Sequence, residues 1–307
     1  MTKRKKKHPW LKFFGFVVLF FILVGGGLAY YVYHSLTNTV ATMHTPINRE
    51  ISEKRVEPVS LQKQQPFSVL LLGVDEREGD RGRSDTMIVM AVNPTLNTTK
   101  LLSIPRDTRT DIIGKGTVDK INHAWAFGGP EMSMDTVEHF LDIPIDYYVK
   151  VNMKSFKDIV DAVGGVTVEN SSAFTTGDQK FPAGTLTLNG KEALSYSRER
   201  YSDPNGDFGR QERQRQIIQA VLQKGASISS VANFSDILSA LSKNIQTNLE
   251  FDQMVDIQAN YRSATESIVQ NTIKETGQKI NGVYYGIVDN TELQKVQNEL
   301  KTQLEIE

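Results

Sequence analysis

Charged residues that can bind phosphate or a metal ion follow two apolar segments of the sequence. Asp75 comes directly after the apolar run 67–74, Asp85 lies ten residues further on, and Arg106 follows the run 100–104. Other charged residues near these positions are Arg77, Arg81, Arg83 and Asp107. Ligands of open α/β sheets bind beyond the strand ends, where guanidinium groups bind phosphate and two carboxylates suit Mg²⁺. The pattern indicates an anion site with Asp75 and Asp85 as candidate magnesium ligands, although surface salt bridges would give the same pattern.

A second group of cationic residues lies on a predicted helix. Arg210, Arg213 and Gln214 have the spacing i, i+3, i+4, and apolar residues continue their stripe: Ile217, Ile218, Val221 and Leu222. We expect these arginines to face the core, as does Arg198, one turn after Leu194 on the preceding helix. A buried guanidinium needs an anion, because an unpaired buried charge is too costly. Local carboxylates are few (Asp203, Asp207 and Glu212), so we expect a polyanion from outside the chain.

Most other catalytic chemistry is excluded by what the sequence lacks. There is no cysteine, so thiol catalysis, zinc thiolates and disulfides are all ruled out. The motifs G-x-S-x-G, H-E-x-x-H, G-x-G-x-x-G after a strand, and the P-loop are absent. For His123, a packing or polar-contact role is favoured over that of a general base. Mg²⁺ and guanidinium groups remain as the plausible catalytic apparatus.

The elements that must position these residues alternate between strand and helix patterns, which argues for an α/β layer architecture. Strands are expected at 67–74, 87–92, 100–104, 147–151, 166–168 and 282–288. Helices are expected at 121–127, 133–141, 155–163, 188–198, 211–224, 231–242, 251–261 and 291–304. Ser155 is the expected N-cap of its helix.

The N-terminus predicts a membrane anchor. Six basic residues lie within residues 1–12, and 21 uncharged residues follow at 13–33, enough to cross ~30 Å of hydrocarbon. Basic residues before the span place the N-terminus in the cytoplasm and residues 34–307 outside the cell. A cleaved signal peptide, with its apolar core at 13–24, is the alternative. Residues 34–66 are polar and are expected to form a partly helical extracellular stalk before a catalytic domain at 67–307.

The charge balance argues against nucleic-acid binding. The whole chain of 307 residues has 35 Lys and Arg against 36 Asp and Glu, a net charge of −1. Without the six basic residues of the tail, 29 basic residues face 36 acidic ones, a net charge of −7. An acidic exported part is a poor surface for binding nucleic acid.

Seven short motifs occur in order between Phe67 and Leu222. They are Leu72-Gly-Val-Asp75, Arg83-Ser-Asp-Thr86, Ser103-Ile-Pro-Arg-Asp-Thr108, Asp119-Lys-Ile-Asn-His-Ala124, Leu188-Asn-Gly-Lys-Glu-Ala-Leu194, Ser197-Arg-Glu-Arg200 and Gly209-Arg-Gln-Glu-Arg-Gln214. Together with the tail and anchor, they resemble the LytR-CpsA-Psr family, and most closely its LytR-type branch in Gram-positive bacteria. Seven motifs in sequence make the resemblance specific.

The resemblance implies a three-layer α/β/α sandwich around a mixed central sheet, with an isoprenoid chain in a long apolar pocket. It implies that Asp75 and Asp85 hold Mg²⁺. The residues implied to bind pyrophosphate are Arg83, Arg106, Lys120, Arg198, Arg200, Arg210, Arg213 and Gln214. The catalytic group is expected to comprise Asp75, Asp85, Arg106 and Asp107, and either Asp75 or Asp107 could take the proton of the acceptor hydroxyl.

The activity implied by the resemblance is that of a polyprenyl glycopolymer phosphotransferase. Such an enzyme moves an anionic glycopolymer, such as wall teichoic acid, from a polyprenyl-pyrophosphate carrier onto a muramic acid hydroxyl of peptidoglycan. Phosphoryl transfer of this kind depends on positioning and charge neutralisation, which the predicted groups supply. A hydrolase acting on the same lipid pyrophosphate, or a binding protein without turnover, would share the same motifs.

Overall fold

The computed structural model describes residues 33–49, 51–75, 82–200, 203, 205–227 and 245–306. The predicted membrane span lies outside these residues except for its last residue, Tyr33, and the predicted helix at 231–242 lies outside them as well. In the described part of the chain, no helix is both long enough and apolar enough to cross a bilayer.

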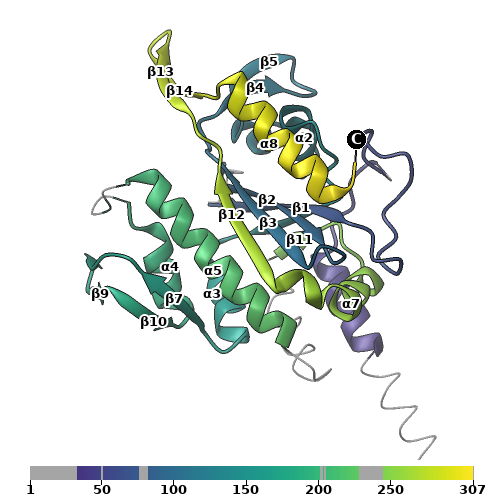
Figure 1. Cartoon of the computed structure of the whole chain (residues 1–307), viewed down its shortest axis with the longest axis horizontal. Coiled ribbons are helices and arrows are strands. Elements are labelled where there is room, and N and C mark those ends of the chain that lie inside the picture. Colours follow the sequence, from purple (N-terminus) through teal and green to yellow (C-terminus); the bar gives the residue numbers. More distant parts are fainter. Residues whose placement is uncertain are drawn as a thin grey trace, which may run out of the picture.

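A six-stranded mixed sheet forms the centre of the molecule (Figure 1). The strands, in spatial order, are β11 (Ile245–Thr247), β6 (Tyr147–Val151), β1 (Phe67–Val74), β2 (Ser84–Asn93), β3 (Thr98–Ile104) and β12 (Ser267–Thr272). β1 is antiparallel to β2 and parallel to β6, while β12 is parallel to β3. The sequence predicted the four central strands but missed β11 and β12, which are short or largely polar edge strands.

Helices flank both faces of this sheet, as the α/β prediction expected. Leu70, Leu72 and Val74 of β1 pack against α2 (His123–Leu141) and α8 (Asn290–Leu304). The alternate residues Leu71 and Gly73 face the other side. The helices on that side are α3 (Met153–Ala162), α4 (Gly190–Arg198) and α5 (Asp207–Ser227). Coverage of both faces explains why β1 is apolar at nearly every position.

Smaller elements surround the sheet in the described part of the chain. They are the pairs β4 (Arg109–Ile112) with β5 (Thr117–Lys120), β7 (Val166–Asn170) with β10 (Gly184–Leu188), β8 (Phe174–Thr176) with β9 (Gln179–Phe181), and β13 (Thr276–Ile280) with β14 (Val283–Ile287), together with α7 (Phe251–Asn260) and the 3-10 helix η1 (Arg262–Thr265). Of the strands in these pairs, the sequence predicted only β7 and β14.

Two helices differ from the sequence prediction for clear local reasons. The two helices expected at 121–127 and 133–141 are joined as α2, with a kink at Gly129 (φ 67°, ψ −146°) immediately before Pro130. The N-cap of α3 is Asn152 rather than Ser155, because the Asn152 side chain accepts from the amides of Lys154 and Ser155. The Ser155 hydroxyl instead accepts from the Asn152 amide, which completes a capping box.

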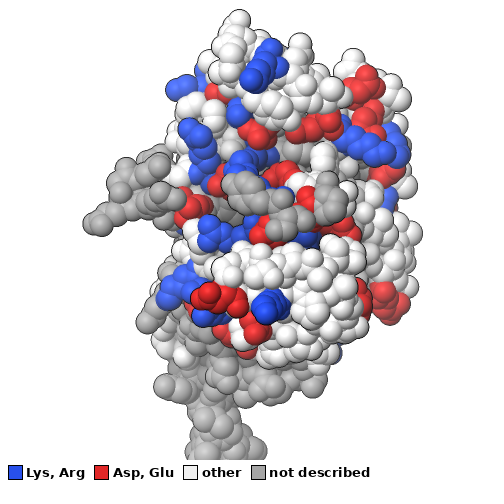
Figure 2. Space-filling model, turned by 90° about the vertical axis from the view of Figure 1, so that its left-hand side faces the viewer, with Lys and Arg blue, Asp and Glu red and all other residues white. Residues whose placement is uncertain are grey.

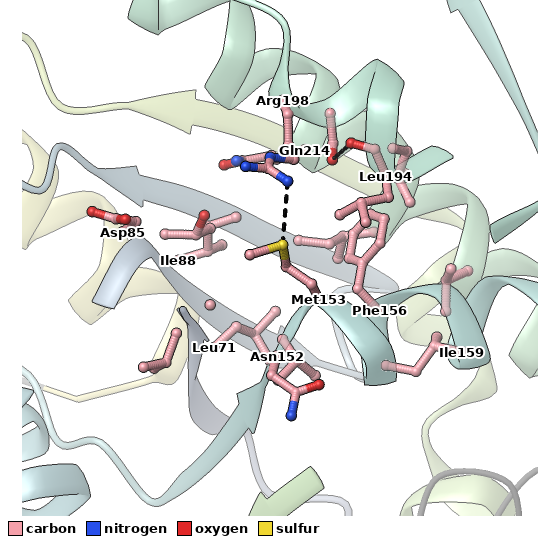
Figure 3. Close-up of a pocket in the computed structure, with 18 of the residues that line it drawn as sticks. Leu71, Asp85, Ile88, Asn152, Met153, Phe156, Ile159, Leu194, Arg198 and Gln214 are labelled. Carbon is pink, nitrogen blue, oxygen red and sulfur yellow. Dashed lines mark hydrogen bonds between the residues drawn. The ribbon is translucent and has the colours of Figure 1, made fainter. Parts of the chain in front are cut away.

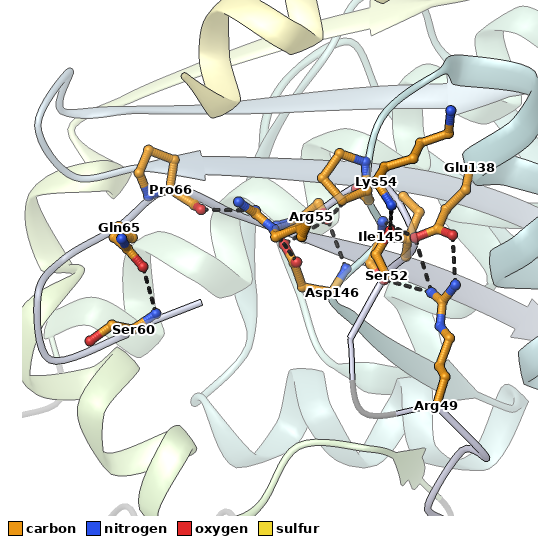
Figure 4. Close-up of polar contacts among 12 residues, drawn as sticks. Arg49, Ser52, Lys54, Arg55, Ser60, Gln65, Pro66, Glu138, Ile145 and Asp146 are labelled. Atoms are coloured by element: carbon orange, nitrogen blue, oxygen red, sulfur yellow. Dashed lines mark hydrogen bonds and ion pairs between the residues drawn. The ribbon is translucent and has the colours of Figure 1, made fainter. Parts of the chain in front are cut away.

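The segment expected to be a stalk packs against the domain along much of its length. Residues 33–43 are helical, and their buried side chains Leu36, Val40 and Met43 contact Ile245 and Phe251. Further along, arginines attach the segment to buried carboxylates (Figure 4). Arg49 binds Glu138 through both terminal nitrogens, at 2.6 and 3.0 Å, and Arg55 binds Asp146 at 2.6 and 2.8 Å. The polar composition reflects ion pairing with the domain rather than separation from it.

We expect Arg49→Met to lower the free energy of unfolding by about 3–5 kcal/mol, because it leaves Glu138 buried without its cation. Lys54→Met is the matched control, since Lys54 pairs with the more exposed Asp142 and such surface pairs contribute about 0–1 kcal/mol. Denaturant unfolding of both variants checks this. Equal losses of stability would show that the Arg49 pair does not hold the segment in place.

Candidate active site

A cavity of about 560 Å³ lies between the sheet and the helices α3, α4 and α5 (Figure 3). Its apolar lining comes from the sheet and from all three helices, and includes Leu71, Ile88, Met90, Val149, Phe156, Ile159, Leu194, Ile217 and Val221. Charged and polar side chains line it as well: Asp75, Asp85, Arg106, Arg198, Arg200, Arg210 and Gln214. One cavity therefore combines an extensive apolar surface with a cluster of predicted anion-binding residues.

The ends of strands and helices bring these charged groups together. Asp75 follows the end of β1, and Arg106 follows the end of β3 two residues after Ile104. Arg198 is the last residue of α4, while Arg210 and Gln214 lie in the first turns of α5. Apart from Arg213, the residues of the stripe predicted on α5 line the cavity from Arg210 to Leu222, because this face of the helix is turned towards the sheet.

Asp85 reaches the cavity through a β-bulge. Gly73 pairs with Thr86 and Val74 pairs with Ser84, so Asp85 is the extra residue of β2. A bulge redirects the side chain that it inserts, and here the redirected carboxylate lines the cavity with Asp75. Gly73 is needed opposite the bulge, since a Cβ there would lie 2.9 Å from the Thr86 Cβ.

The cationic groups of the cavity are incompletely neutralised by carboxylates. Arg106 Nη1 donates to Asp85 Oδ1 at 2.7 Å; burial lowers the pKa of Arg106, but the contact with Asp85 outweighs it and the pKa is raised. Arg210 pairs with Asp207 at 2.8 Å, yet its buried Nε has no partner among the described residues. Burial is also the main cause of the lowered pKa of Arg210, and the positive charge of Arg106 adds to it. The arrangement is suited to an anion with several oxygens.

Arg198 adds a further hydrogen-bond donor to the cavity. Its Nη1 donates to the thioether sulfur of Met153 at 3.2 Å (Figure 3). Sulfur is a weak acceptor, so a phosphate oxygen would replace it with a gain in hydrogen-bond energy. Gln214 lies beside Arg198 in the same view.

Four residues expected in the site do not line the cavity: Arg83, Asp107, Lys120 and Arg213. Asp107 lies beside it, held by Lys120 at 2.6 Å and by Arg106 at 3.7 Å. Arg213 faces α4 instead and donates to the carbonyl oxygen of Tyr196 at 3.0 Å, while it also pairs with the buried side chain of Asp203 in the loop after α4. The structure thus gives Arg213 partners from the chain itself, unlike the expectation that it binds pyrophosphate.

Sequence reasoning did not single out Arg215, although it is buried on α5 beside Gln214. Its Nη1 donates to the hydroxyls of Ser103 at 2.7 Å and Thr272 at 2.5 Å, joining α5 to β3 and β12. No periodic signal distinguishes it, because it lies outside the apolar stripe. His123 has the polar contact expected for it, with Nδ1 at 2.7 Å from Asp119 Oδ2.

The carboxylates of the cavity can supply only part of a metal shell. Among the described residues, no group of three or more His, Asp or Glu side chains is arranged to hold a metal ion. Asp75 and Asp85 nevertheless line one cavity together with the arginines. Mg²⁺ commonly binds one or two carboxylates and completes its shell with substrate phosphates and water, so this donor set fits the ion when an anionic substrate is present.

Charged side chains of both signs are gathered on one face of the molecule. Figure 2 shows Lys, Arg, Asp and Glu side chains gathered in a band across the middle of one face. Below that band, much of the surface is formed by uncharged residues. Both signs occur in the band, so this face is not the continuous basic surface that general nucleic-acid binding requires.

Similar proteins are found by family model, by sequence and among solved structures. The model of the LytR_cpsA_psr family matches residues 30–302. The polyisoprenyl-teichoic acid–peptidoglycan teichoic acid transferase TagU of Bacillus subtilis (strain 168) is 53% identical over 303 residues, which cover 99% of this chain and 98% of TagU. The crystal structure of B. subtilis TagU matches with a TM-score of 0.65 at 53% identity, over 79% of this chain and 98% of that one. The structure of TagT bound to LIIa-WTA matches with a TM-score of 0.74 at 33% identity, over 86% of this chain and 100% of that one. The chain belongs to the LytR-CpsA-Psr family.

Proposed function

We propose that this protein is a phosphotransferase that moves a teichoic-acid-type glycopolymer from a polyprenyl-pyrophosphate carrier onto peptidoglycan. The observation that carries the proposal is the combination of an apolar lining and a cluster of arginines in one cavity. A lipid pyrophosphate has the same two parts, an apolar chain and a polyanionic head. The similar TagU proteins are named for this transfer, and the similar TagT is a solved complex with LIIa-WTA.

The residues of the cavity divide the work of transfer between them. Arg106, Arg198 and Arg210 bind the pyrophosphate and offset the charge that builds on the departing lipid phosphate. The apolar lining from the sheet, α3 and α5 holds the lipid chain and excludes water. The polymer phosphate is then attacked in line by an acceptor hydroxyl, which forms a new phosphodiester and breaks the pyrophosphate bond. A carboxylate, that of Asp75 or Asp107, takes the hydroxyl proton.

Mg²⁺ is the cofactor proposed for this site, held by Asp75 and Asp85. When bound, it would neutralise charge on the pyrophosphate oxygens. Asp85 pairs with Arg106 in the structure, so both groups are already beside the site where the pyrophosphate is proposed to bind. Arg200, just beyond the end of α4, also lines the cavity and is proposed to bind the pyrophosphate.

The same proposal includes the cellular arrangement. Residues 1–12 lie in the cytoplasm, residues 13–33 cross the membrane once, and the catalytic domain lies outside the cell. The basic tail followed by 21 uncharged residues supports this orientation. Because an extracellular domain has no access to nucleoside triphosphates, the pyrophosphate bond of the donor supplies the energy for transfer.

The direct test mixes the full chain with lipid-pyrophosphate-linked teichoic acid and polymer-free peptidoglycan, in Mg²⁺ or in chelator. We expect polymer to become attached to peptidoglycan only in Mg²⁺. Release of polymer into solution without attachment would identify a hydrolase, and binding without any product would identify a non-catalytic protein. Equal transfer in chelator would contradict the proposed role of Mg²⁺.

A further inference from the structure

The turn that carries Arg106 is held in place by the β13–β14 hairpin. The Thr108 amide donates to the carbonyl oxygen of Pro105 at 3.1 Å, which closes a turn with Arg106 and Asp107 at its tip. The amide of Gly286 in β14 donates to the carbonyl oxygen of Asp107 at 2.9 Å. Because Arg106 lines the cavity, the position of this turn decides where its guanidinium lies.

Glu275, just before β13, lies at the contact between this turn and β14. Its Oε2 is 3.0 Å from the hydroxyl of Thr108, a fully buried residue. Gly286 leaves room for the carboxyl group, since a Cβ there would overlap the same oxygen. Thr108 and Gly286 also form a parallel bridge, and the β13–β14 hairpin lies near β4 and β5 in Figure 1. The carboxyl group therefore occupies the space that the glycine leaves open.

The hydroxyl of Thr108 has one hydrogen and two oxygen neighbours. It lies 2.7 Å from the carbonyl oxygen of Pro105, which can only accept, and 3.0 Å from Glu275 Oε2. Both contacts are full hydrogen bonds only when the carboxyl of Glu275 is protonated and donates to the hydroxyl oxygen. The geometry therefore fits a neutral Glu275.

The groups that face Glu275 favour the same neutral form. Burial raises the pKa of its carboxyl, the Thr108 hydroxyl opposes this in part, and the negative charges of Asp107 and Asp207 raise the pKa further. From β14, the Tyr284 hydroxyl faces it, and burial followed by the charge of Glu275 raises the pKa of that tyrosine, which stays uncharged. A proton on Glu275 therefore removes a repulsion from two neighbouring aspartates.

Ionisation of Glu275 would add a negative charge where the cations already have partners. The described cations near it bind the aspartates: Arg106 and Lys120 with Asp107, and Arg210 with Asp207. An ionised Glu275 would repel Asp107 and draw the Thr108 hydrogen away from Pro105. The hold on the turn is therefore complete below the ordinary pKa of a glutamate and is lost as the pH rises through the raised pKa of Glu275.

We propose that Glu275 is a positioning residue for polymer transfer, and that its neutral carboxyl fixes the 105–108 turn beside the cavity. This rests on the proposed transfer function and adds a means of regulation to the same site. The turn presents Arg106 to the pyrophosphate and holds Asp107, one of the two proposed proton acceptors, next to it. Loosening of the turn as the pH rises slows transfer without removing any group that contacts the substrate.

Amide hydrogen exchange on the full chain measures the hold on the turn directly. Glu275→Ala and Thr108→Val should each speed exchange of the Gly286 amide about tenfold, because each removes a hydrogen bond that holds the turn against β14. Glu275→Gln should keep the slow exchange, since its neutral amide can still donate to Thr108. Glu266→Ala is the matched control, because Glu266 is an exposed glutamate at the other end of β12. Unchanged exchange in β1 would show that the fold is intact.

Transfer rates connect the turn to catalysis. Glu275→Ala and Thr108→Val should lower the single-turnover rate about tenfold or more, because a displaced Arg106 is no longer aligned with the pyrophosphate. Glu275→Gln should transfer like the parent chain at low pH. The ratio of its rate to the parent rate should rise with pH, since only the parent ionises at this position. A residue that merely supports the fold would leave this ratio independent of pH.

Three results would overturn the inference. They are exchange at Gly286 that is the same in Glu275→Ala and in Glu266→Ala, a rate ratio for Glu275→Gln that is constant with pH, and a loss of rate at low pH that is equal in Glu275→Gln and Glu275→Ala. A parent chain that transfers no polymer would contradict the proposed function, whereas exchange at Gly286 would still decide whether Glu275 fixes the turn.

Discussion

Replacing Arg210 by methionine is expected to lower the rate of polymer transfer by about 10²-fold or more, with the melting temperature unchanged or slightly raised. Arg210 lines the cavity, its Nε is buried without a partner in the described structure, and burial lowers its pKa. Such a group adds little to stability but stabilises negative charge on a bound pyrophosphate. Methionine keeps most of the apolar stem and removes only the guanidinium.

Arg213, one turn along the same helix, provides the opposite expectation. Its guanidinium binds Asp203, and both side chains are only 8% exposed. Arg213→Met should therefore lower the free energy of unfolding by about 3–5 kcal/mol, since it leaves a buried carboxylate unpaired. Thermal unfolding together with single-turnover transfer measures both properties. If Arg210→Met kept the parent rate, or if both variants lost only stability, Arg210 would be a structural residue.

Asp85→Asn is expected to lower transfer by about 10²-fold or more and to move the Mg²⁺ midpoint to higher concentration. Asparagine keeps the size of the side chain but loses the charge that a hard cation requires. The same change weakens the contact with Arg106, which accounts for part of the loss in rate. The Mg²⁺ dependence separates the two effects, because positioning Arg106 alone would leave the midpoint unchanged.

The matched control for Asp85 is Asp111→Asn on β4. The Asp111 side chain is 65% exposed and does not line the cavity. We expect its rate and Mg²⁺ midpoint to equal those of the parent chain. An Asp85→Asn variant whose Mg²⁺ midpoint matched that of Asp111→Asn would contradict the assignment of Asp85 as a metal ligand.

The periodic parts of the sequence were the most predictable. The stripe on α5 correctly indicated that Arg210 and Gln214 share a face with Ile217 and Val221, because helical spacing alone places them there. Arg213 lies at the edge of that stripe and meets α4 instead. Short hairpins such as β4–β5 were missed, because they have little apolar periodicity and are stabilised by pairing between strands.

By itself, the sequence determined the α/β class, the central strands, the amphipathic face of α5 and the family motifs, all of which depend on local spacing and residue type. Only the tertiary structure decided which charged groups meet. The bulge that brings Asp85 into the cavity depends on the register between β1 and β2, and the pairing of Arg49 with Glu138 depends on residues 89 positions apart. Such contacts are decided by long-range packing and by the cost of leaving buried charges unpaired, which no local pattern encodes.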